Sequence, residues 1–183
     1  MRTLVTGGVR SGKSAVAERL LTEAAALLPA EVPVTYVATG PSSDDPDWAD
    51  RIASHRSRRP GAWQTLETPD LASALDSLTG PAIVDCLGTW LTGVLDELDV
   101  WDAPRDDWQP ALHARTTALV AAWSRCPRDV VAVTNEVGWG VVSEHRSGRI
   151  FADELGRLNQ DIARASDSVL LVVAGHVLPL RAP

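Results

Sequence analysis

One segment of eight residues restricts the possible folds of this chain more than any other. Residues 7–14 have the sequence GGVRSGKS, which matches the pattern G-x-x-x-x-G-K-[ST]. The segment follows a short apolar run and precedes a run of helix-forming residues, the context in which this pattern builds a phosphate-binding loop. In such a loop, glycines allow backbone N–H groups and the start of the helix to face phosphate oxygens. We therefore expect the chain to bind a nucleotide.

Two side chains of this segment have expected roles in phosphate chemistry. Lys13 is expected to reach the β- and γ-phosphates of the nucleotide, and the Ser14 hydroxyl is expected to bind Mg²⁺. Lys13 is also the only lysine among 17 cationic residues, since all the others are arginines. A compact ammonium group is thus kept where the pattern requires one. The alternative is a chance match in a glycine-containing turn, which this composition would produce in roughly one such chain in a thousand.

Apolar runs alternate with helix-like runs along the chain. Strands are expected at 4–6, 34–38, 63–66, 81–85, 130–134 and 168–174, helices at 13–28, 47–58, 71–78, 89–98, 111–125 and 149–165, and loops at 39–46, 99–110 and 138–148. The strand runs are rich in β-branched residues without polar alternation, so both faces should be buried. The pattern predicts an α/β fold of the phosphate-loop NTPase (RecA-like) type, with helices on both faces of a largely parallel sheet. The length suits one domain spanning 1–183.

Composition and charge exclude several other classes of protein. The net charge of −7 and the pI near 5.0 argue against a nucleic-acid-binding surface. No apolar run reaches the length of about 18 residues that a membrane span needs, and no signal peptide is expected before the first strand. Cys86 and Cys126 cannot build a disulfide framework, so we expect a cytoplasmic protein. The histidines and cysteines lack the spacing of a zinc site.

The strand expected at 81–85 ends in an acidic residue, Asp85. A carboxylate at the end of an apolar strand beside a phosphate loop can hold Mg²⁺ through water. We therefore expect Asp85 to hold the metal together with Ser14. The alternative is that Asp85 only caps the helix expected from Thr89.

A basic segment is the second informative feature. In a helix over 47–58, Arg51 and His55 would lie one turn apart on the same face, and Arg59 would extend that row. Nearby positive charge keeps an imidazole neutral and nucleophilic, and the arginines can stabilise a phosphoryl group under attack. The alternative is a solvated basic face that carries a surface histidine, and the spacing alone favours this alternative.

Among phosphate-loop proteins, a small-molecule kinase fits the length of the chain. A GTPase would need an N-K-x-D motif to read the base, and the sequence Thr134-Asn135-Glu136 lacks the lysine. Motor ATPases are usually longer. The phosphate loop by itself does not identify the acceptor.

Several short motifs follow one another in a specific order. They are Gly7 to Ser14, Tyr36 to Thr39, Arg51-Ile52, His55-Arg56, Arg59-Pro60, Trp63, Thr65, Glu67, Val84 to Leu87, Val133 to Gly138, Gly140, and Gly156 to Gln160. In this order they resemble the bifunctional adenosylcobinamide kinase / adenosylcobinamide-phosphate guanylyltransferase family of cobalamin biosynthesis. The resemblance covers nearly the whole chain. The Arg-Ser pair of the phosphate loop and the histidine–arginine block are not shared by other small-molecule kinases.

The resemblance implies two activities. The first phosphorylates the aminopropanol hydroxyl of adenosylcobinamide with ATP or GTP. The second transfers GMP from GTP to that phosphate, giving adenosylcobinamide-GDP and pyrophosphate. In the family the second step passes through a GMP–histidine intermediate, and His55 is the histidine in the matching block. A covalent intermediate divides one transfer into two easier ones.

The resemblance also implies the site residues and the partners. Catalytic roles go to His55, Lys13 and Asp85, metal binding to Ser14 and Asp85, and nucleotide binding to Gly7, Gly8, Val9, Arg10, Ser11, Gly12, Lys13, Ser14, Thr39, Gly40, Pro41, Arg56, Arg59, Pro60, Trp63, Glu67 and Asp85. Glu67 is expected to bind the guanine or the ribose. The expected metal is Mg²⁺, and the expected partners are ATP or GTP, adenosylcobinamide and its phosphate. A homo-oligomer, in the form of a trimer, is implied as well.

The roles of three further residues stay open. Glu136, at the end of the strand expected at 130–134, either positions the acceptor or an attacking group, or caps a helix. His145 is interpreted as a loop histidine, and His176 as part of the tail.

Two rival functions also stay open. One is a kinase without transferase activity, in which His55 is structural. The other is a nucleotide-sensing binding protein that uses the phosphate loop without turnover.

Overall fold

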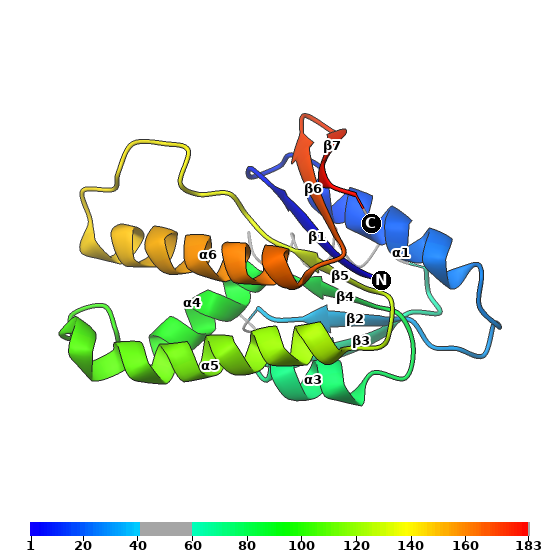
Figure 1. Cartoon of the computed structure of the whole chain (residues 1–183), viewed down its shortest axis with the longest axis horizontal. Coiled ribbons are helices and arrows are strands. Elements are labelled where there is room, and N and C mark those ends of the chain that lie inside the picture. Colours follow the sequence, from blue (N-terminus) through cyan, green and yellow to red (C-terminus); the bar gives the residue numbers. More distant parts are fainter. Residues whose placement is uncertain (41–59, 183) are drawn as a thin grey trace.

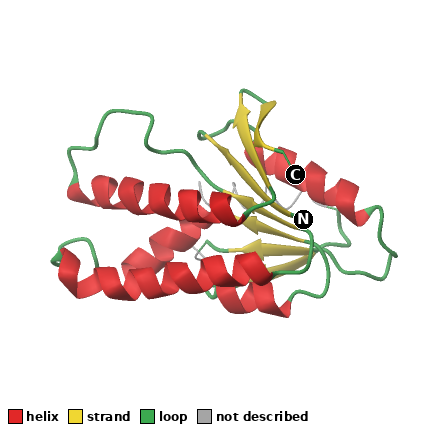
Figure 2. Cartoon of the chain, viewed as in Figure 1, coloured by secondary structure: helices red, strands yellow, loops and turns green. Residues whose placement is uncertain are grey.

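The structure is a computed structural model that describes residues 1–40 and 60–182. These residues form a seven-stranded sheet flanked by helices (Figure 1, Figure 2). The strands are β1 (Arg2–Gly7), β2 (Thr35–Ala38), β3 (Gln64–Glu67), β4 (Ala82–Asp85), β5 (Val130–Val133), β6 (Ser168–Val173) and β7 (His176–Arg181). The helices are α1 (Lys13–Ala25), α3 (Leu71–Ser77), α4 (Leu87–Glu97), α5 (Arg105–Arg125) and α6 (Arg146–Ala165).

The strand order across the sheet is β3-β2-β4-β5-β1-β6-β7. Every neighbouring pair is parallel except β6 and β7, which form an antiparallel hairpin at one margin of the sheet. Parallel pairing brings the carboxyl ends of the first six strands to one edge of the sheet. The expected α/β fold with a largely parallel sheet is confirmed.

The sheet buries a hydrophobic core on each face, because successive side chains of a strand point to opposite faces. In β1, Leu4 belongs to the larger core, beneath α3, α4, α5 and α6, and Val5 belongs to the smaller core, beneath α1. Figure 2 shows α1 on one side of the sheet and the other helices on the opposite side. All four side chains of β5 are buried, as expected for a strand that is covered on both faces.

The segment 99–110 was expected to be a loop, and this expectation is wrong for its second half. Helix α5 begins at Arg105 and continues through Pro110, its sixth residue. Asp106 and Asp107 lie in the first turn, where acidic side chains favour a helix N-terminus. The side chains of Trp108 and Leu112, on either side of Pro110, are buried in the larger core, so the helix packs there although the proline removes one backbone hydrogen bond.

The C-terminal segment contains a strand that the sequence pattern did not indicate. His176, interpreted as tail, is the first residue of β7, whose six residues are all exposed. An exposed edge strand that contains Pro179 shows no apolar alternation, so it gave no strand signal. Ala174 and Gly175 form the tight turn before it, and both have positive φ values of 49° and 81°, which suit a hairpin turn.

The other differences concern the ends of elements. Helix α1 ends at Ala25 rather than at residue 28, α4 begins at Leu87 rather than at 89, and α6 begins at Arg146 rather than at 149. The helix expected at 47–58 lies outside the described residues.

An ion pair joins the start of β1 to the segment between α6 and β6. The Arg2 guanidinium donates to both carboxylate oxygens of Asp167, from Nη2 to Oδ1 over 2.6 Å and from Nε to Oδ2 over 3.2 Å. The Arg2 backbone N–H also donates to Oδ2. These bonds to Arg2 lower the pKa of Asp167 from 3.8 to about 2.

We predict that Asp167→Asn lowers the free energy of unfolding at pH 7 by roughly 1 kcal/mol, a value reduced for solvent screening of this partly exposed pair. The folded pKa lies below the unfolded one, so the contribution is present at neutral pH and is lost as the pH falls from 3.8 to about 2. Urea unfolding at several pH values should therefore show the two proteins converging in acid. Asp161→Asn, which removes an exposed pair with Arg164 on α6, is the control. A difference that stays constant with pH would contradict the prediction.

Candidate active site

The phosphate loop connects the carboxyl end of β1 to the start of α1. Gly12, the residue before α1, has a φ of 96°, which a residue with a side chain adopts only with strain. Gly7 lies so close to β6 that a Cβ atom there would be 2.4 Å from the carbonyl oxygen of Val172. Both glycines that the pattern fixes, Gly7 and Gly12, are therefore required by the backbone path itself.

Three carbonyl groups of the loop accept hydrogen bonds from donors other than the loop's own backbone N–H groups. The Gly7 carbonyl accepts from the Glu136 N–H over 3.2 Å, and the Ser11 carbonyl accepts from the Gly175 N–H over 2.8 Å. The Gly8 carbonyl accepts from Nζ of Lys13 over 3.0 Å. The first N–H groups of α1 have no acceptor within the helix, so they can bind an anion at this position.

One buried hydroxyl group is suited to bind a phosphate. Ser11 Oγ is buried and has no hydrogen-bond partner among the described residues. It lies against Gly7, where a Cβ atom would be 2.7 Å from it. A buried hydroxyl without a partner is costly unless a ligand satisfies it. The residues of the loop therefore fit a bound phosphate chain.

The register of the parallel strands aligns the expected site residues along one edge. Val5 pairs with Val133, Val133 with Asp85, Asp85 with Ala38, and Ala38 with Glu67. Asp85 and Glu67 are the last residues of their strands, so both lie at the edge that carries the phosphate loop. Glu67 is exposed there, which leaves its carboxylate accessible to a ligand.

Asp85 lies farther from the phosphate loop than the sequence suggested. Strand β5 separates β4 from β1, so at about 4.8 Å per strand the two strands lie about 10 Å apart. The Tyr36 hydroxyl donates to Oδ2 of Asp85 over 2.9 Å. The alternative in which Asp85 caps α4 is wrong, because Cys86 occupies the cap position and its N–H donates to Thr89 Oγ1.

Thr39 follows β2 and is tied to the start of α4. Its hydroxyl donates to the Cys86 carbonyl over 2.7 Å and lies 2.9 Å from Oγ1 of Thr89. Thr39 is buried and Gly40 is half-buried. The end of β2 is thus held at the edge of the sheet where the nucleotide is expected.

Pro60 and Trp63 do not lie at the edge of the sheet that carries the phosphate loop. They precede β3, so they lie at its amino end, while the phosphate loop follows the carboxyl end of β1. Trp63 packs against the smaller core. The structure does not bring these two residues together with the phosphate loop. Pro41, His55, Arg56 and Arg59 lie outside the described residues.

Glu136 lies directly beside the phosphate loop. Its Oε1 accepts a hydrogen bond from the Thr6 hydroxyl of β1 over 2.7 Å, and its backbone N–H bonds to Gly7. The helix-capping alternative for Glu136 is wrong, because the next helix, α6, begins ten residues later with His145 at its cap.

The turn between β6 and β7 is a contact that sequence reasoning missed. Gly175 donates to the Ser11 carbonyl, and its Cα is 3.4 Å from the position of a Cβ at Gly12. The only available signal was a glycine after an apolar run, which predicts a turn but not its neighbour.

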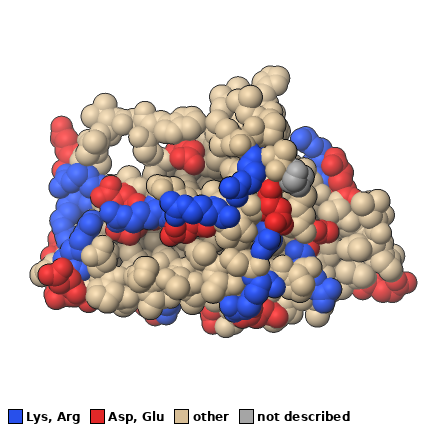
Figure 3. Space-filling view, viewed as in Figure 1, with Lys and Arg blue, Asp and Glu red and all other residues tan. Residues whose placement is uncertain are grey.

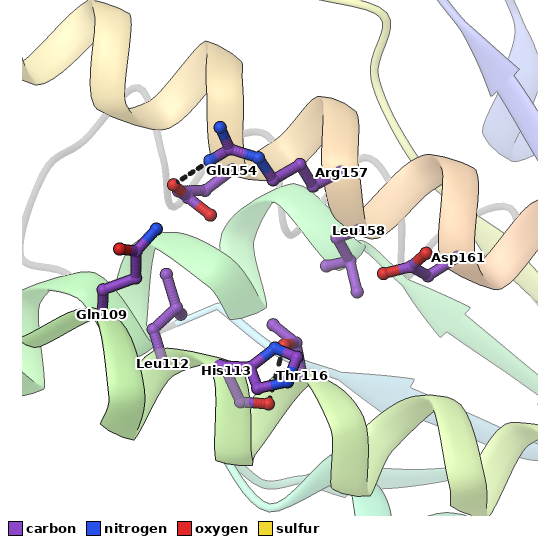
Figure 4. Close-up of a pocket in the computed structure, with 8 residues that line it drawn as sticks. All are labelled: Gln109, Leu112, His113, Thr116, Glu154, Arg157, Leu158 and Asp161. Carbon is purple, nitrogen blue, oxygen red and sulfur yellow. Dashed lines mark hydrogen bonds and ion pairs between the residues drawn. The ribbon is translucent and has the colours of Figure 1, made fainter.

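A surface groove of about 190 Å³ lies between α5 and α6 (Figure 4). Its lining residues are Gln109, Leu112, His113, Thr116, Glu154, Arg157, Leu158 and Asp161. Glu154 and Arg157, one turn apart on α6, form an ion pair along the α6 side of the groove. None of the expected site residues lines this groove.

The surface of the molecule carries charged groups of both signs. On the face shown in Figure 3, arginines are interspersed with acidic side chains. Within residues 1–40 and 60–182, no helix is long and apolar enough to cross a membrane. In the same residues, no three His, Cys, Asp or Glu side chains gather to hold a metal. Mg²⁺ needs no such group, since it commonly takes one or two carboxylates together with substrate phosphates.

The comparison with known families decides the identity. Residues 3–180 match the family described as cobinamide kinase / cobinamide phosphate guanyltransferase, CobU. The chain belongs to this family. It is 40% identical to the bifunctional adenosylcobalamin biosynthesis protein CobU of Escherichia coli (strain K12), over 96% of this chain and 97% of that one. It is 39% identical to the corresponding protein CobP of Pseudomonas aeruginosa (strain PAO1), over 99% and 98% of the two chains.

Solved structures with low sequence identity share the fold. An ATPase of a bacterial type III secretion system matches 93% of this chain and 50% of its own, with a TM-score of 0.54 and 10% identity. The flagellar accessory protein FlaH of Methanocaldococcus jannaschii matches 99% of this chain and 78% of its own, with a TM-score of 0.51 and 12% identity. These likenesses support the phosphate-loop NTPase type of fold.

We predict that Lys13→Ala weakens the binding of ATP or GTP by about 10- to 100-fold, because a hydrogen bond to a charged phosphate is lost. Isothermal titration with each nucleotide and Mg²⁺ measures the change. Arg19→Ala, on the exposed side of α1, is the matched control and should leave the affinity unchanged. Equal affinity of the wild type and the Lys13 variant would contradict the assignment of the loop.

Proposed function

We propose that this chain phosphorylates the aminopropanol hydroxyl of adenosylcobinamide with ATP or GTP, and then transfers GMP from GTP to that phosphate. The observation that carries the proposal is the phosphate loop at the carboxyl edge of the sheet, in a chain that matches the family over residues 3–180. The products of the second reaction are adenosylcobinamide-GDP and pyrophosphate.

In the first reaction the chain holds the triphosphate and neutralises its charge. The loop N–H groups and Lys13 bind the phosphate oxygens, and Ser11 Oγ supplies a further donor. Ser14, half-buried at the start of α1, and Asp85 would hold Mg²⁺, which when bound neutralises charge between the phosphates. Positioning and charge stabilisation supply most of the catalysis in such a transfer.

In the second reaction His55 is the proposed nucleophile. A ring nitrogen of His55 attacks the α-phosphorus of GTP, a nitrogen–phosphorus bond forms, and pyrophosphate leaves. An oxygen of the acceptor phosphate then attacks the same phosphorus, and the nitrogen–phosphorus bond breaks. Thr39, Gly40, Pro41, Arg56, Arg59 and Glu67 are the proposed nucleotide contacts outside the loop.

We also infer that the protein acts as a homo-oligomer, proposed to be a trimer, in the cytoplasm. The segment after Glu136 exposes Trp139, Val141 and Val142, and the edge strand β7 exposes Leu178 and Leu180. Large apolar side chains exposed in two such segments support the proposal, because surfaces that a partner covers are rich in exposed apolar groups. Both cysteines are free thiols, in agreement with a reducing compartment.

We predict that wild-type protein mixed with GTP and Mg²⁺ gains the mass of one GMP, and that His55→Ala does not. The adduct should be labile to acid and stable to base, as a phosphoramidate is. Intact-protein mass spectrometry measures the gain. His113→Ala, on the exposed face of α5, is the matched control and should still gain the mass.

The other outcomes point to the rival functions. A mass gain in His55→Ala would place the nucleophile on another residue. Bound nucleotide without any mass gain in the wild type would contradict the transferase. Turnover with adenosylcobinamide then distinguishes a kinase from a nucleotide sensor.

A further inference from the structure

Glu136 carries a carboxylate that is hydrogen-bonded to Thr6, near the carboxyl end of β1 where the phosphate loop begins. We propose that Glu136 is the general base of the kinase reaction and that Thr6 is its positioning residue. This inference rests on the proposed function, since it assigns a proton acceptor to the first of the two reactions.

The position of Glu136 follows from the strand order. Strand β5 is the direct neighbour of β1, and Val133, its last residue, pairs with Val5. The chain beyond β5 continues along the end of β1, where the Thr134 N–H donates to the Val5 carbonyl and the Glu136 N–H donates to the Gly7 carbonyl. Glu136 is therefore held by its backbone at the entrance of the phosphate loop.

The carboxylate of Glu136 is oriented by one specific contact. The Thr6 hydroxyl, buried in β1, donates to Oε1 over 2.7 Å. A carboxylate has two oxygens, so the contact with Oε1 leaves Oε2 available as a proton acceptor. Glu136 is half-buried, so a substrate can approach it.

The backbone beneath Glu136 is fixed by α6. Asn159 is buried, and its Oδ1 accepts from the Thr134 hydroxyl over 2.6 Å. Its Nδ2 donates to the Asn135 carbonyl over 3.0 Å. One helix residue thus holds the two residues that precede Glu136, and a catalytic group needs such rigid support.

Asp85 is less suited to the role of base. It belongs to β4, one strand farther from β1, and its Oδ2 accepts from Tyr36. Asp85 also has the proposed metal role. The two carboxylates at the edge would therefore divide the work, with Asp85 at the metal and Glu136 at the acceptor.

The proposed step is balanced in atoms and charge. The acceptor hydroxyl gives its proton to Oε2 of Glu136, while its oxygen forms a bond to the γ-phosphorus. The bond from the γ-phosphorus to the oxygen that bridges it to the β-phosphorus breaks, and the nucleoside diphosphate leaves. Glu136 later releases the proton to water.

The second reaction does not need this base. Its acceptor is a phosphate group, which is already ionised at neutral pH and attacks without losing a proton to the protein. Loss of the base should therefore slow the kinase reaction alone. Loss of a residue that merely supports the fold should slow both reactions.

The test is Glu136→Gln, which keeps the shape of the side chain and removes the proton acceptor. The kcat of adenosylcobinamide phosphorylation with ATP should fall by about 100-fold or more. Guanylyl transfer from GTP to supplied adenosylcobinamide phosphate should stay within about threefold of the wild type. The Kd for ATP and the formation of the GMP adduct should also be unchanged. Glu144→Gln, exposed in the same loop, is the matched control and should retain both activities.

A pair of substitutions tests the positioning role of Thr6. Thr6→Val removes the donor at nearly constant volume and should lower the kinase kcat with little change in the KM for ATP. Thr6→Ser keeps the hydroxyl donor and should have the kinase kcat of the wild type.

Each result decides the proposal. An unchanged kinase rate in Glu136→Gln, or equal losses in both reactions, would overturn it. Absence of kinase activity in the wild type would overturn the proposed function and the assignment of Glu136 together. Kinase activity that is present in the wild type and lost only in Glu136→Gln supports both.

Discussion

The backbone of the phosphate loop is held from three sides, and the site is built around this restraint. Its carbonyl groups accept from Glu136 after β5, from Gly175 in the β6–β7 turn, and from Lys13 at the start of α1. Each donor comes from a different element. Because the carbonyls are turned toward these donors, the N–H groups at the start of α1 are left to face an anion. A loop held in this way loses little conformational entropy when it binds phosphate.

The order of the strands gives the two acidic residues different surroundings. Glu136 follows β5, which is next to β1, and it is bonded to Thr6. Asp85 ends β4, one strand farther away, and it is bonded to Tyr36. Both lie at the same edge because all these strands are parallel. A single sheet edge therefore places one carboxylate beside the loop and the other two strands away from β1.

Local patterns predicted most elements of this fold. The buried run 130–134 and the glycine pattern 7–14 are strong local signals, and both were confirmed as β5 and as the turn into α1. The failures have a common cause. Helix α5 passes through Pro110 while its buried face packs in the larger core, and β7 is a strand through its pairing with β6 rather than through its own pattern. Local patterns also failed to place the expected site residues near residue 60. Trp63 lies at the amino end of β3, away from the phosphate loop.

The phosphate loop, the α/β class and the family could be predicted from the amino-acid sequence, because they depend on residues that are close together in the chain and on motifs in a specific order. The position of β5 between β1 and β4, the bond from Thr6 to Glu136 and the bond from Gly175 to the phosphate loop became known from the folded chain. Their partners are far apart in the sequence, so no local pattern indicates them. Thr6 and Glu136 are 130 residues apart, and their contact exists only because long-range packing sets the order of parallel strands.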